Sequence, residues 1–191
     1  MVKAVLAQRG DAILRRVPHG GRVVEVGVLI GALSRYLLAR RRDISLVMVD
    51  NWAHAEIQPE AYKATRDVHA YRSEARARQD EARARQTVAM FGDRVSILKD
   101  DSADAPKALE PFSFDLVFLD ADHSEIGVTR DIEAWSPMVK PDGWLGGHDY
   151  ANPDPAFDFG VTAAVDRWSA DRGLAVDVDQ NFTWFASLRD I

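Results

Sequence analysis

Short apolar runs alternate with segments of helical periodicity along most of this chain of 191 residues. The clearest run spans residues 22–26, where Val23, Val24 and Val26 predict a buried strand because β-branched residues suit a pleated surface. Two glycines follow in residues 27–31, and apolar residues then recur at helical spacing. Further runs predict strands at residues 44–49, 95–98, 114–119 and 144–147, and a closing hairpin at residues 174–178 and 182–188. Strands that alternate with helices indicate an α/β fold.

A long charged helix is predicted over residues 59–90, which contain no internal glycine or proline. Two Glu-to-Arg pairs have the i,i+4 spacing that stabilises a helix: Glu74–Arg78 and Glu81–Arg85. Small apolar residues seven apart predict a thin packing seam: Val68, Ala75, Ala82 and Ala89. We interpret residues 53–91 as a helical insertion or lid after the second strand. Its basic face is predicted to be solvated, and the helix could support a homodimer.

Composition limits the classes of function. We expect one domain over residues 1–191, with an amphipathic helix within residues 1–18. The sequence has no cysteine, which excludes disulfides and thiolate sites, and no apolar run of membrane-spanning length. The N-terminus carries no secretory pattern, so we expect a cytoplasmic protein without a membrane partner.

Charge is distributed unevenly along the chain. The net charge is −6, but residues 1–99 carry +7 and residues 100–191 carry −13. An acidic half does not suit a nucleic-acid partner, whereas it suits a metal ion or a cationic cofactor. Solvated surface carboxylates account for most of these charges in either case.

Candidate ligand-binding residues follow the carboxyl ends of five predicted strands. In order along the chain they are Glu25 and Gly27, then Asp50, Asn51 and Trp52, then Asp101 and Ser102, then Asp120 and His123, and finally His148 and Asp149. Because the carboxyl ends of parallel strands share one edge of a sheet, where ligands of open α/β proteins bind, we expect one site there.

The turn after the first strand reads Glu25-x-Gly27-x-x-x-Gly31. It differs from the dinucleotide fingerprint G-x-G-x-x-G because Leu29 stands at the position of the middle glycine. Gly27 allows a sharp turn, and Gly31 allows a close approach to a ligand. A carboxylate at Glu25 suits a cationic amine. Asp50 lies 23 residues after Gly27, close to the spacing of a carboxylate that accepts hydrogen bonds from ribose hydroxyls.

Two other positions have open interpretations. Trp52 could cover the face of an adenine ring or belong to the core. Ser102, directly after Asp101, could cap a helix or read an adenine amine.

Together these motifs resemble those of class I S-adenosylmethionine (AdoMet) methyltransferases over roughly residues 20–150. The resemblance rests on the glycine turn, Asp50, the strand Phe114–Asp120 and the turn Val139–Gly143. Residues 119–124 and 146–150 are similar to methyltransferase family 24, a branch similar to metal-dependent O-methyltransferases of catechols and macrolide sugars. It implies a Rossmann-like, doubly wound, mostly parallel sheet of seven strands with a C-terminal antiparallel hairpin.

The resemblance also implies roles for individual residues. Asp120 and Asp149 match carboxylates that bind a metal in the catechol-type enzymes, and His123 stands where those enzymes place a lysine base. His148 is either the third ligand or a base, because Tyr150 replaces the asparagine of the catechol type. The metal would be Mg²⁺ or another divalent cation. Residues expected to bind AdoMet are Glu25, Gly27, Gly31, Asp50, Asn51, Trp52, Asp101, Ser102 and Asp120.

We therefore predict transfer of a methyl group from AdoMet to a hydroxyl of a small molecule, assisted by a divalent metal and a histidine base. Methylation of an amine is a variant of this prediction. Two alternatives from other classes remain: an NAD-type oxidoreductase of the same architecture, and a non-catalytic module that uses the AdoMet-binding fold and the charged helix for interactions.

Overall fold

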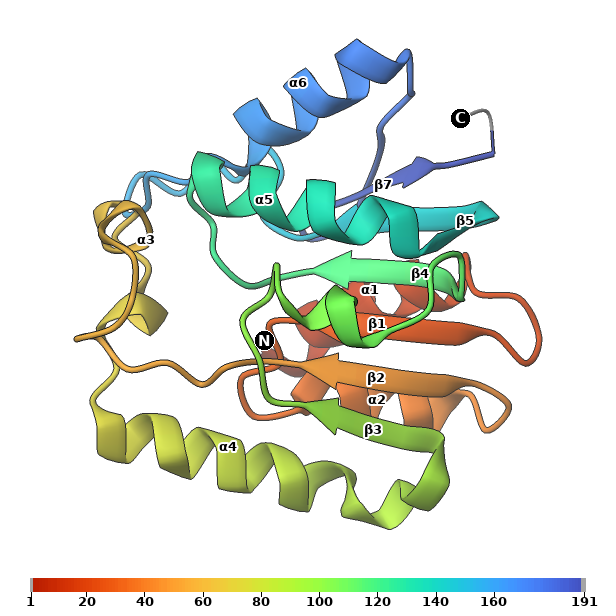
Figure 1. The fold of residues 1–191 in the computed structure, drawn as a ribbon, viewed down its shortest axis with the longest axis horizontal. Coiled ribbons are helices and arrows are strands. Elements are labelled where there is room, and N and C mark those ends of the chain that lie inside the picture. The colour runs from red at the N-terminus through yellow and green to blue at the C-terminus, as the bar shows by residue number, and fades with distance from the viewer. Residues whose placement is uncertain (1, 190–191) are drawn as a thin grey trace.

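One sheet of seven strands runs through the computed structural model, which describes residues 2–189 (Figure 1). Its order is β3-β2-β1-β4-β5-β7-β6. The strands are β1 (Arg22–Val26), β2 (Ser45–Val49), β3 (Val95–Leu98), β4 (Phe114–Leu119), β5 (Val139–Gly147), β6 (Asp177–Asp179) and β7 (Thr183–Ser187). Neighbours among β1 to β5 pair in parallel, whereas β7 pairs antiparallel with both β5 and β6. The predicted sheet and its antiparallel hairpin are confirmed.

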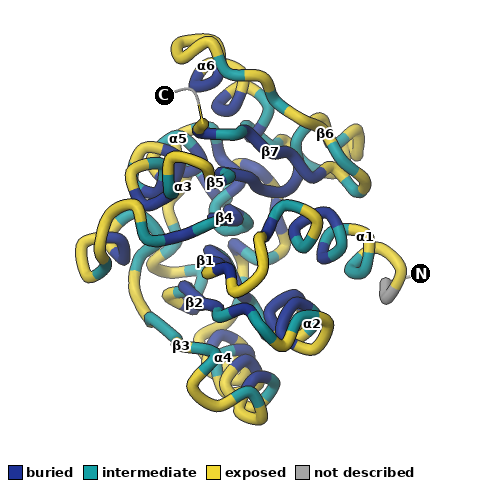
Figure 2. Tube along the Cα trace, turned by 90° about the vertical axis from the view of Figure 1, so that its right-hand side faces the viewer, coloured by how far each residue is buried: buried dark blue, intermediate teal, exposed yellow. Residues whose placement is uncertain are grey.

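Helices cover both faces of this sheet because successive strand side chains point in opposite directions. From β4, Val117 and Leu119 pack in the apolar core beneath α5 (Glu125–Trp135) and α6 (Val161–Arg172). Leu116 and Phe118 join the core on the opposite face, under the remaining long helices: α1 (Val2–Leu14), α2 (Ala32–Arg40) and α4 (Glu74–Val88). The central strands are buried and the outer faces of the helices are exposed (Figure 2).

The predicted long helix over residues 59–90 is wrong. The chain forms α3 (Glu60–Ala64), the 3₁₀ helix η1 (Val68–Tyr71) and α4, which leads into η2 (Ala89–Arg94). The Asp67 carboxylate accepts a hydrogen bond from the backbone N–H of His69, and the Ser73 hydroxyl accepts one from Arg76. Asp and Ser side chains favour helix starts of this kind, and here they override the helical propensity of the segment.

The packed face of α4 also differs from the predicted seam. Ala75, Ala82 and Ala89 are exposed, and so is Val68. The buried residues of α4 are Ala77, Asp80, Ala84 and Val88. They are three or four residues apart, so they lie on one side of the helix, and α4 packs against α2. Both predicted Glu-to-Arg pairs are confirmed, with N–O distances of 2.6 Å and 2.9 Å.

Two short 3₁₀ helices complete the elements: η3 (Ala105–Ala108) and η4 (Ser136–Met138). β5 begins at Val139, five residues before the predicted Trp144, because the turn into the strand is itself extended. Within residues 2–189, none of the helices combines the length and the apolar character that a membrane crossing requires.

Candidate functional site

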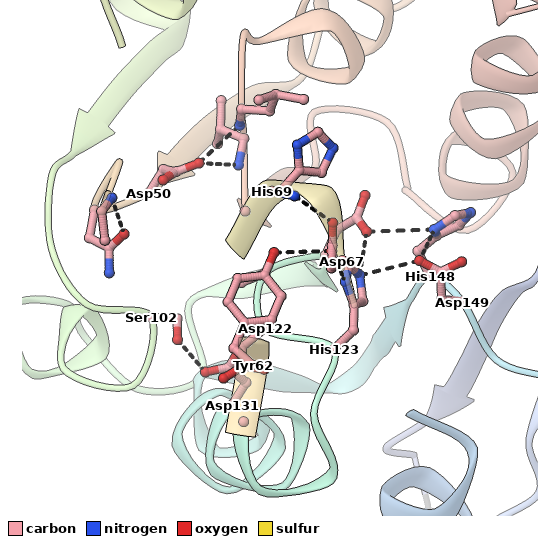
Figure 3. A pocket seen from close by; sticks show the side chains of 18 of the residues that line it. Asp50, Tyr62, Asp67, His69, Ser102, Asp122, His123, Asp131, His148 and Asp149 are labelled. Carbon is pink, nitrogen blue, oxygen red and sulfur yellow. Dashed lines mark hydrogen bonds and ion pairs between the residues drawn. The ribbon is translucent and has the colours of Figure 1, made fainter. Parts of the chain in front are cut away.

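A cavity of about 450 Å³ opens at the carboxyl edge of the sheet, beneath α3 and η1 (Figure 3). Its volume lies within the usual range for small-molecule sites. Most of the predicted site residues line it: Glu25, Gly27, Asp50, Asn51, Asp101, Ser102, Asp120, His123, His148 and Asp149. The other two, Gly31 and Trp52, lie behind the turn that forms one wall.

Gly27 makes the first turn tight. Its φ is +87°, and an added Cβ would lie 2.0 Å from the carbonyl oxygen of Asp120. Asp50 stabilises the same turn, since its Oδ2 accepts hydrogen bonds from the backbone N–H groups of Val28 and Leu29, each at 2.9 Å. Burial raises the pKa of Asp50, and these backbone donors oppose that rise. The Asp50 carboxylate therefore has two roles: it holds the turn that forms one wall of the cavity, and it lines the cavity itself.

Gly31 and Trp52 support this turn from outside the cavity. Gly31 has a φ of +73°, and an added Cβ would lie 3.3 Å from the carbonyl oxygen of Ala84 in α4. The ring of Trp52 is buried, and its indole N–H donates to the carbonyl of Leu29 at 2.8 Å. Gly31 thus allows a close approach between two helices, and Trp52 belongs to the core.

Glu25 is a buried carboxyl group at the floor of the cavity. It accepts a hydrogen bond from the hydroxyl of Ser34 on α2. Burial raises the pKa of Glu25 to about 8, and the hydrogen bond from Ser34 only partly opposes this. A cationic group placed beside Glu25 would restore its charged form.

Ser102 pairs with a residue that the sequence analysis did not identify. Its hydroxyl donates to Asp131 Oδ1 at 2.5 Å, and its carbonyl accepts the indole N–H of Trp135 at 2.8 Å. Asp131 is buried on α5, and burial raises its pKa to about 7. The helical spacing of α5 is the one feature of the sequence that indicates a buried Asp131, because Asp131 falls on the same face as the apolar Val128 and Trp135.

Three side chains at the ends of β4 and β5 form the centre of the site. One ligand atom each from Asp120, His123 and Asp149 lies within 4.8 Å of the others, the one cluster of this kind within residues 2–189. His123 Nε2 lies 3.3 Å from both Asp120 Oδ1 and Asp149 Oδ2. Asp149 adopts a φ of +61°, a backbone strain of the kind found at functional sites.

A fourth carboxylate holds the other side of the His123 ring. Asp67, between α3 and η1, places its Oδ2 2.9 Å from His123 Nδ1. Burial lowers the pKa of His123, but the hydrogen bonds to Asp120 and Asp67 raise it more, to about 10. In the protein without ligands, His123 is therefore an imidazolium at neutral pH.

His148 contacts the cluster from the side and pairs with Arg9 of α1. Arg9 Nη1 lies 2.5 Å from Asp120 Oδ2, and Arg9 Nη2 lies 2.7 Å from His148 Nε2. Because a guanidinium only donates, His148 Nε2 accepts and Nδ1 carries the proton. Nδ1 lies 2.9 Å from Asp149 Oδ2 and 3.6 Å from Asp120 Oδ1. Burial raises the pKa of Asp120, but the charge of Arg9, together with the hydrogen bond and the charge of His123, outweighs it and holds this pKa well below its usual range.

Aromatic side chains form the outer wall beside His123. The Phe159 ring lies 4.7 Å from the imidazole, centroid to centroid, and stacks on Phe157 at 4.6 Å. Tyr62 of α3 lies on another side at 6.4 Å. These aromatic residues, like Arg9 and Asp67, lie outside the strand ends, so the pattern of strand ends in the sequence could not indicate them.

The match with known proteins agrees with this geometry. Residues 24–150 match a family model described as a methyltransferase domain, that of methyltransferase family 24. The chain belongs to this family. It is an S-adenosylmethionine-dependent methyltransferase, and the predicted family is confirmed. No curated protein matches the sequence.

Solved structures of similar fold include the pyocyanin biosynthetic protein PhzM, a SAM-dependent methyltransferase from Aquifex aeolicus, and CalS11, a TDP-rhamnose 3′-O-methyltransferase of calicheamicin biosynthesis. Their sequence identities are 17%, 14% and 15%, with TM-scores of 0.61, 0.60 and 0.60. The matches cover 95%, 95% and 97% of this chain, and 54%, 89% and 79% of the respective structures. The chain thus spans about half the length of PhzM. At these identities the likeness shows the fold alone.

Proposed function

We propose that this methyltransferase acts on a hydroxyl group of a small molecule. The observation that carries the proposal is the cluster of Asp120, His123 and Asp149, which lies beside the Gly27 turn in a cavity of ligand-binding size. Methyl transfer requires an acceptor oxygen held in line with the methyl carbon. A group of carboxylates and imidazoles next to the cofactor turn suits the orientation and deprotonation of a hydroxyl.

The cofactor would lie along the first three strand ends. We assign to it the predicted residues that line the cavity there: Glu25, Gly27, Asp50, Asn51, Asp101, Ser102 and Asp120. The predicted residues Gly31 and Trp52 would act indirectly, by supporting the turn from outside the cavity. Asp50 Oδ1 accepts one backbone hydrogen bond, from Trp52 at 2.7 Å, which leaves it capacity for a ribose hydroxyl. Glu25 would pair with the amino group of the methionine part.

The residues of the cluster fit a divalent cation. Two carboxylates and one imidazole are ligands for such ions. His123 Nε2 and His148 Nδ1 both lie near Asp120 Oδ1 and Asp149 Oδ2. The sequence-based choice of third ligand was His148; we propose His123 instead, because the Arg9 donor at His148 Nε2 leaves the proton on His148 Nδ1, the nitrogen that faces these carboxylates. When bound, the cation would lower the pKa of the acceptor hydroxyl. Arg9 pairs with Asp120 Oδ2, and its guanidinium would add positive charge beside the acceptor hydroxyl.

His148 is the proton acceptor that we assign. Both nitrogens of His123 face carboxylates, whereas His148 Nε2 is an acceptor that receives hydrogen bonds from Arg9 and from Asn181 Nδ2 at 3.2 Å. A substrate hydroxyl would take the place of one of these donors. The other nitrogen of His148, Nδ1, lies 2.9 Å from Asp149 Oδ2. Bound AdoMet would supply the methyl group to the acceptor oxygen, His148 would take the hydroxyl proton, and the products would be a methyl ether and S-adenosylhomocysteine.

Calorimetric titration of AdoMet and detection of S-adenosylhomocysteine test this proposal together. We expect wild-type protein to bind AdoMet, and to release S-adenosylhomocysteine with one or more members of a panel of phenols and sugar alcohols. Asp50→Asn should weaken AdoMet binding, with the exposed Asp93→Asn as its matched control. His148→Asn should keep AdoMet binding and slow turnover by about a hundredfold or more.

The outcomes separate the alternatives. AdoMet binding without turnover on any hydroxyl compound would contradict the proposal and favour a binding module. Turnover on amines alone would show that the methylated atom is nitrogen. Binding of NAD(H) in place of AdoMet would refute the assignment of the cofactor.

A further inference from the structure

Asp67 is fixed more firmly than a surface carboxylate. Its side chain is 5% exposed, and its Oδ2 accepts a hydrogen bond from the hydroxyl of Tyr62 at 3.1 Å. Its Oδ1 accepts the backbone N–H of His69 at 2.8 Å. Its own backbone N–H donates to the hydroxyl of Thr65 at 3.2 Å. These contacts hold the Asp67 carboxylate in place beside the ring of His123 (Figure 3).

The pairing decides which nitrogen of His123 faces the cluster. A carboxylate accepts, so Nδ1, beside Asp67, keeps its proton, and a bound ion would replace the proton of the imidazolium at Nε2. Nε2 is then the nitrogen that lies 3.3 Å from Asp120 and 3.3 Å from Asp149. Stacking against Phe159 restricts rotation of the ring. A carboxylate behind the second nitrogen is the usual arrangement for a histidine that binds a metal.

The two carboxylates of the cluster are oriented in the same way. Asp120 Oδ2 is held by Arg9 Nη1 at 2.5 Å, so that Oδ1 faces His123. Asp149 Oδ1 accepts from the side-chain amide of Asn152 at 2.7 Å, so that Oδ2 faces His123. Each of the three side chains thus has one atom held from outside and one atom directed at a common point.

We propose that Asp67 is a positioning residue that makes His123 a nitrogen ligand, so that the cluster selects a divalent transition-metal ion over Mg²⁺. The inference rests on the proposed metal-assisted reaction. Imidazole is a ligand for Zn²⁺, Fe²⁺, Co²⁺ and Ni²⁺, whereas Mg²⁺ favours oxygen and retains its waters. Because Asp67 lies in the inserted segment, the affinity for the ion depends on how that segment is placed.

Cobalt is a suitable probe because its visible absorption reports nitrogen coordination. Chelator-treated full-length protein would be titrated with Co²⁺ and with Mg²⁺, by absorption and by calorimetry, without acceptor. We expect Co²⁺ to bind at least about tenfold more tightly than Mg²⁺. Asp67→Asn should weaken Co²⁺ binding by about 10- to 100-fold and alter the spectrum. The same variant should leave Mg²⁺ binding within about threefold, since oxygen ligands are untouched.

Two further variants control for folding and for charge. Asp67→Glu keeps the carboxylate and should recover part of the Co²⁺ affinity, whereas a merely structural role would make it as damaging as Asp67→Asn. Asp158→Asn removes an exposed carboxylate from the adjoining loop and should change nothing. Circular dichroism and AdoMet binding would be recorded for each variant.

Equal affinity for Co²⁺ and Mg²⁺ would overturn the inference, as would a Co²⁺ affinity unchanged in Asp67→Asn. If hydroxyl compounds are methylated but no ion binds, the inference fails and the proposed reaction stands. If Co²⁺ behaves as expected but no hydroxyl compound is methylated, the cation site stands and the proposed reaction fails.

Discussion

Replacing Asp131 by asparagine should change how the stability of this protein depends on pH. Asp131 is 3% exposed and lies on the apolar face of α5, with the hydroxyl of Ser102 as a donor. Burial raises its pKa from an ordinary 3.8 to about 7, and the nearby charges of Asp122 and Asp101 add to the rise. Between these two pH values the folded protein binds a proton that the unfolded chain has released. Stability must therefore fall as pH rises from about 4 to about 7.

The shift sets the size of this effect. A rise of about 3 pKa units corresponds to about 4 kcal/mol, an upper limit because water and local relaxation reduce the cost of a buried charge. Asparagine is a neutral isostere that still accepts a hydrogen bond from Ser102. We expect Asp131→Asn to exceed the wild type in free energy of unfolding by about 2–4 kcal/mol at pH 8, and by less than half as much at pH 5, where the wild type has lost only the first part of this stability.

Urea unfolding followed by circular dichroism, at pH values from 5 to 8 and without AdoMet, measures this difference. The exposed Asp93→Asn controls for the loss of a carboxylate and should follow the wild-type curve. Parallel curves for wild type and Asp131→Asn would refute the reasoning, because they would show that Asp131 ionises in the folded protein at no cost.

Three further substitutions test the framework of the site. Gly27→Ala should abolish AdoMet binding or folding, as measured by calorimetry and thermal unfolding, since its Cβ would lie 2.0 Å from the Asp120 carbonyl; normal binding would contradict this. Asp80→Ala should lower the free energy of unfolding in urea by about 2 kcal/mol, because it removes the buried carboxylate that pairs with Arg72 and Arg76; a change below about 0.5 kcal/mol would contradict this. Asp50→Asn should cost about 1–3 kcal/mol, because asparagine cannot replace a charged acceptor of backbone hydrogen bonds; unchanged stability would limit Asp50 to ligand binding.

Local sequence patterns determined the strands and the edge at which the site lies. A strand buried on both faces is a continuous apolar run, so β1 and β4 could be placed at Arg22–Val26 and Phe114–Leu119. The residue after such a run emerges at the end of the sheet. Gly27, Asp50 and Asp120 could therefore be assigned to one cavity before their distances were known.

Only the tertiary structure decided which side chains meet within that cavity. Arg9 comes from α1 and Asp67 from the inserted segment, and both reach the cluster across more than fifty residues of sequence. No local pattern encodes such contacts, because they depend on how helices pack on the sheet. The same packing brought both His123 Nε2 and His148 Nδ1 next to Asp120 and Asp149. The inserted segment was likewise broken into short helices by the side-chain caps of Asp67 and Ser73, which the helix propensity of single residues does not include.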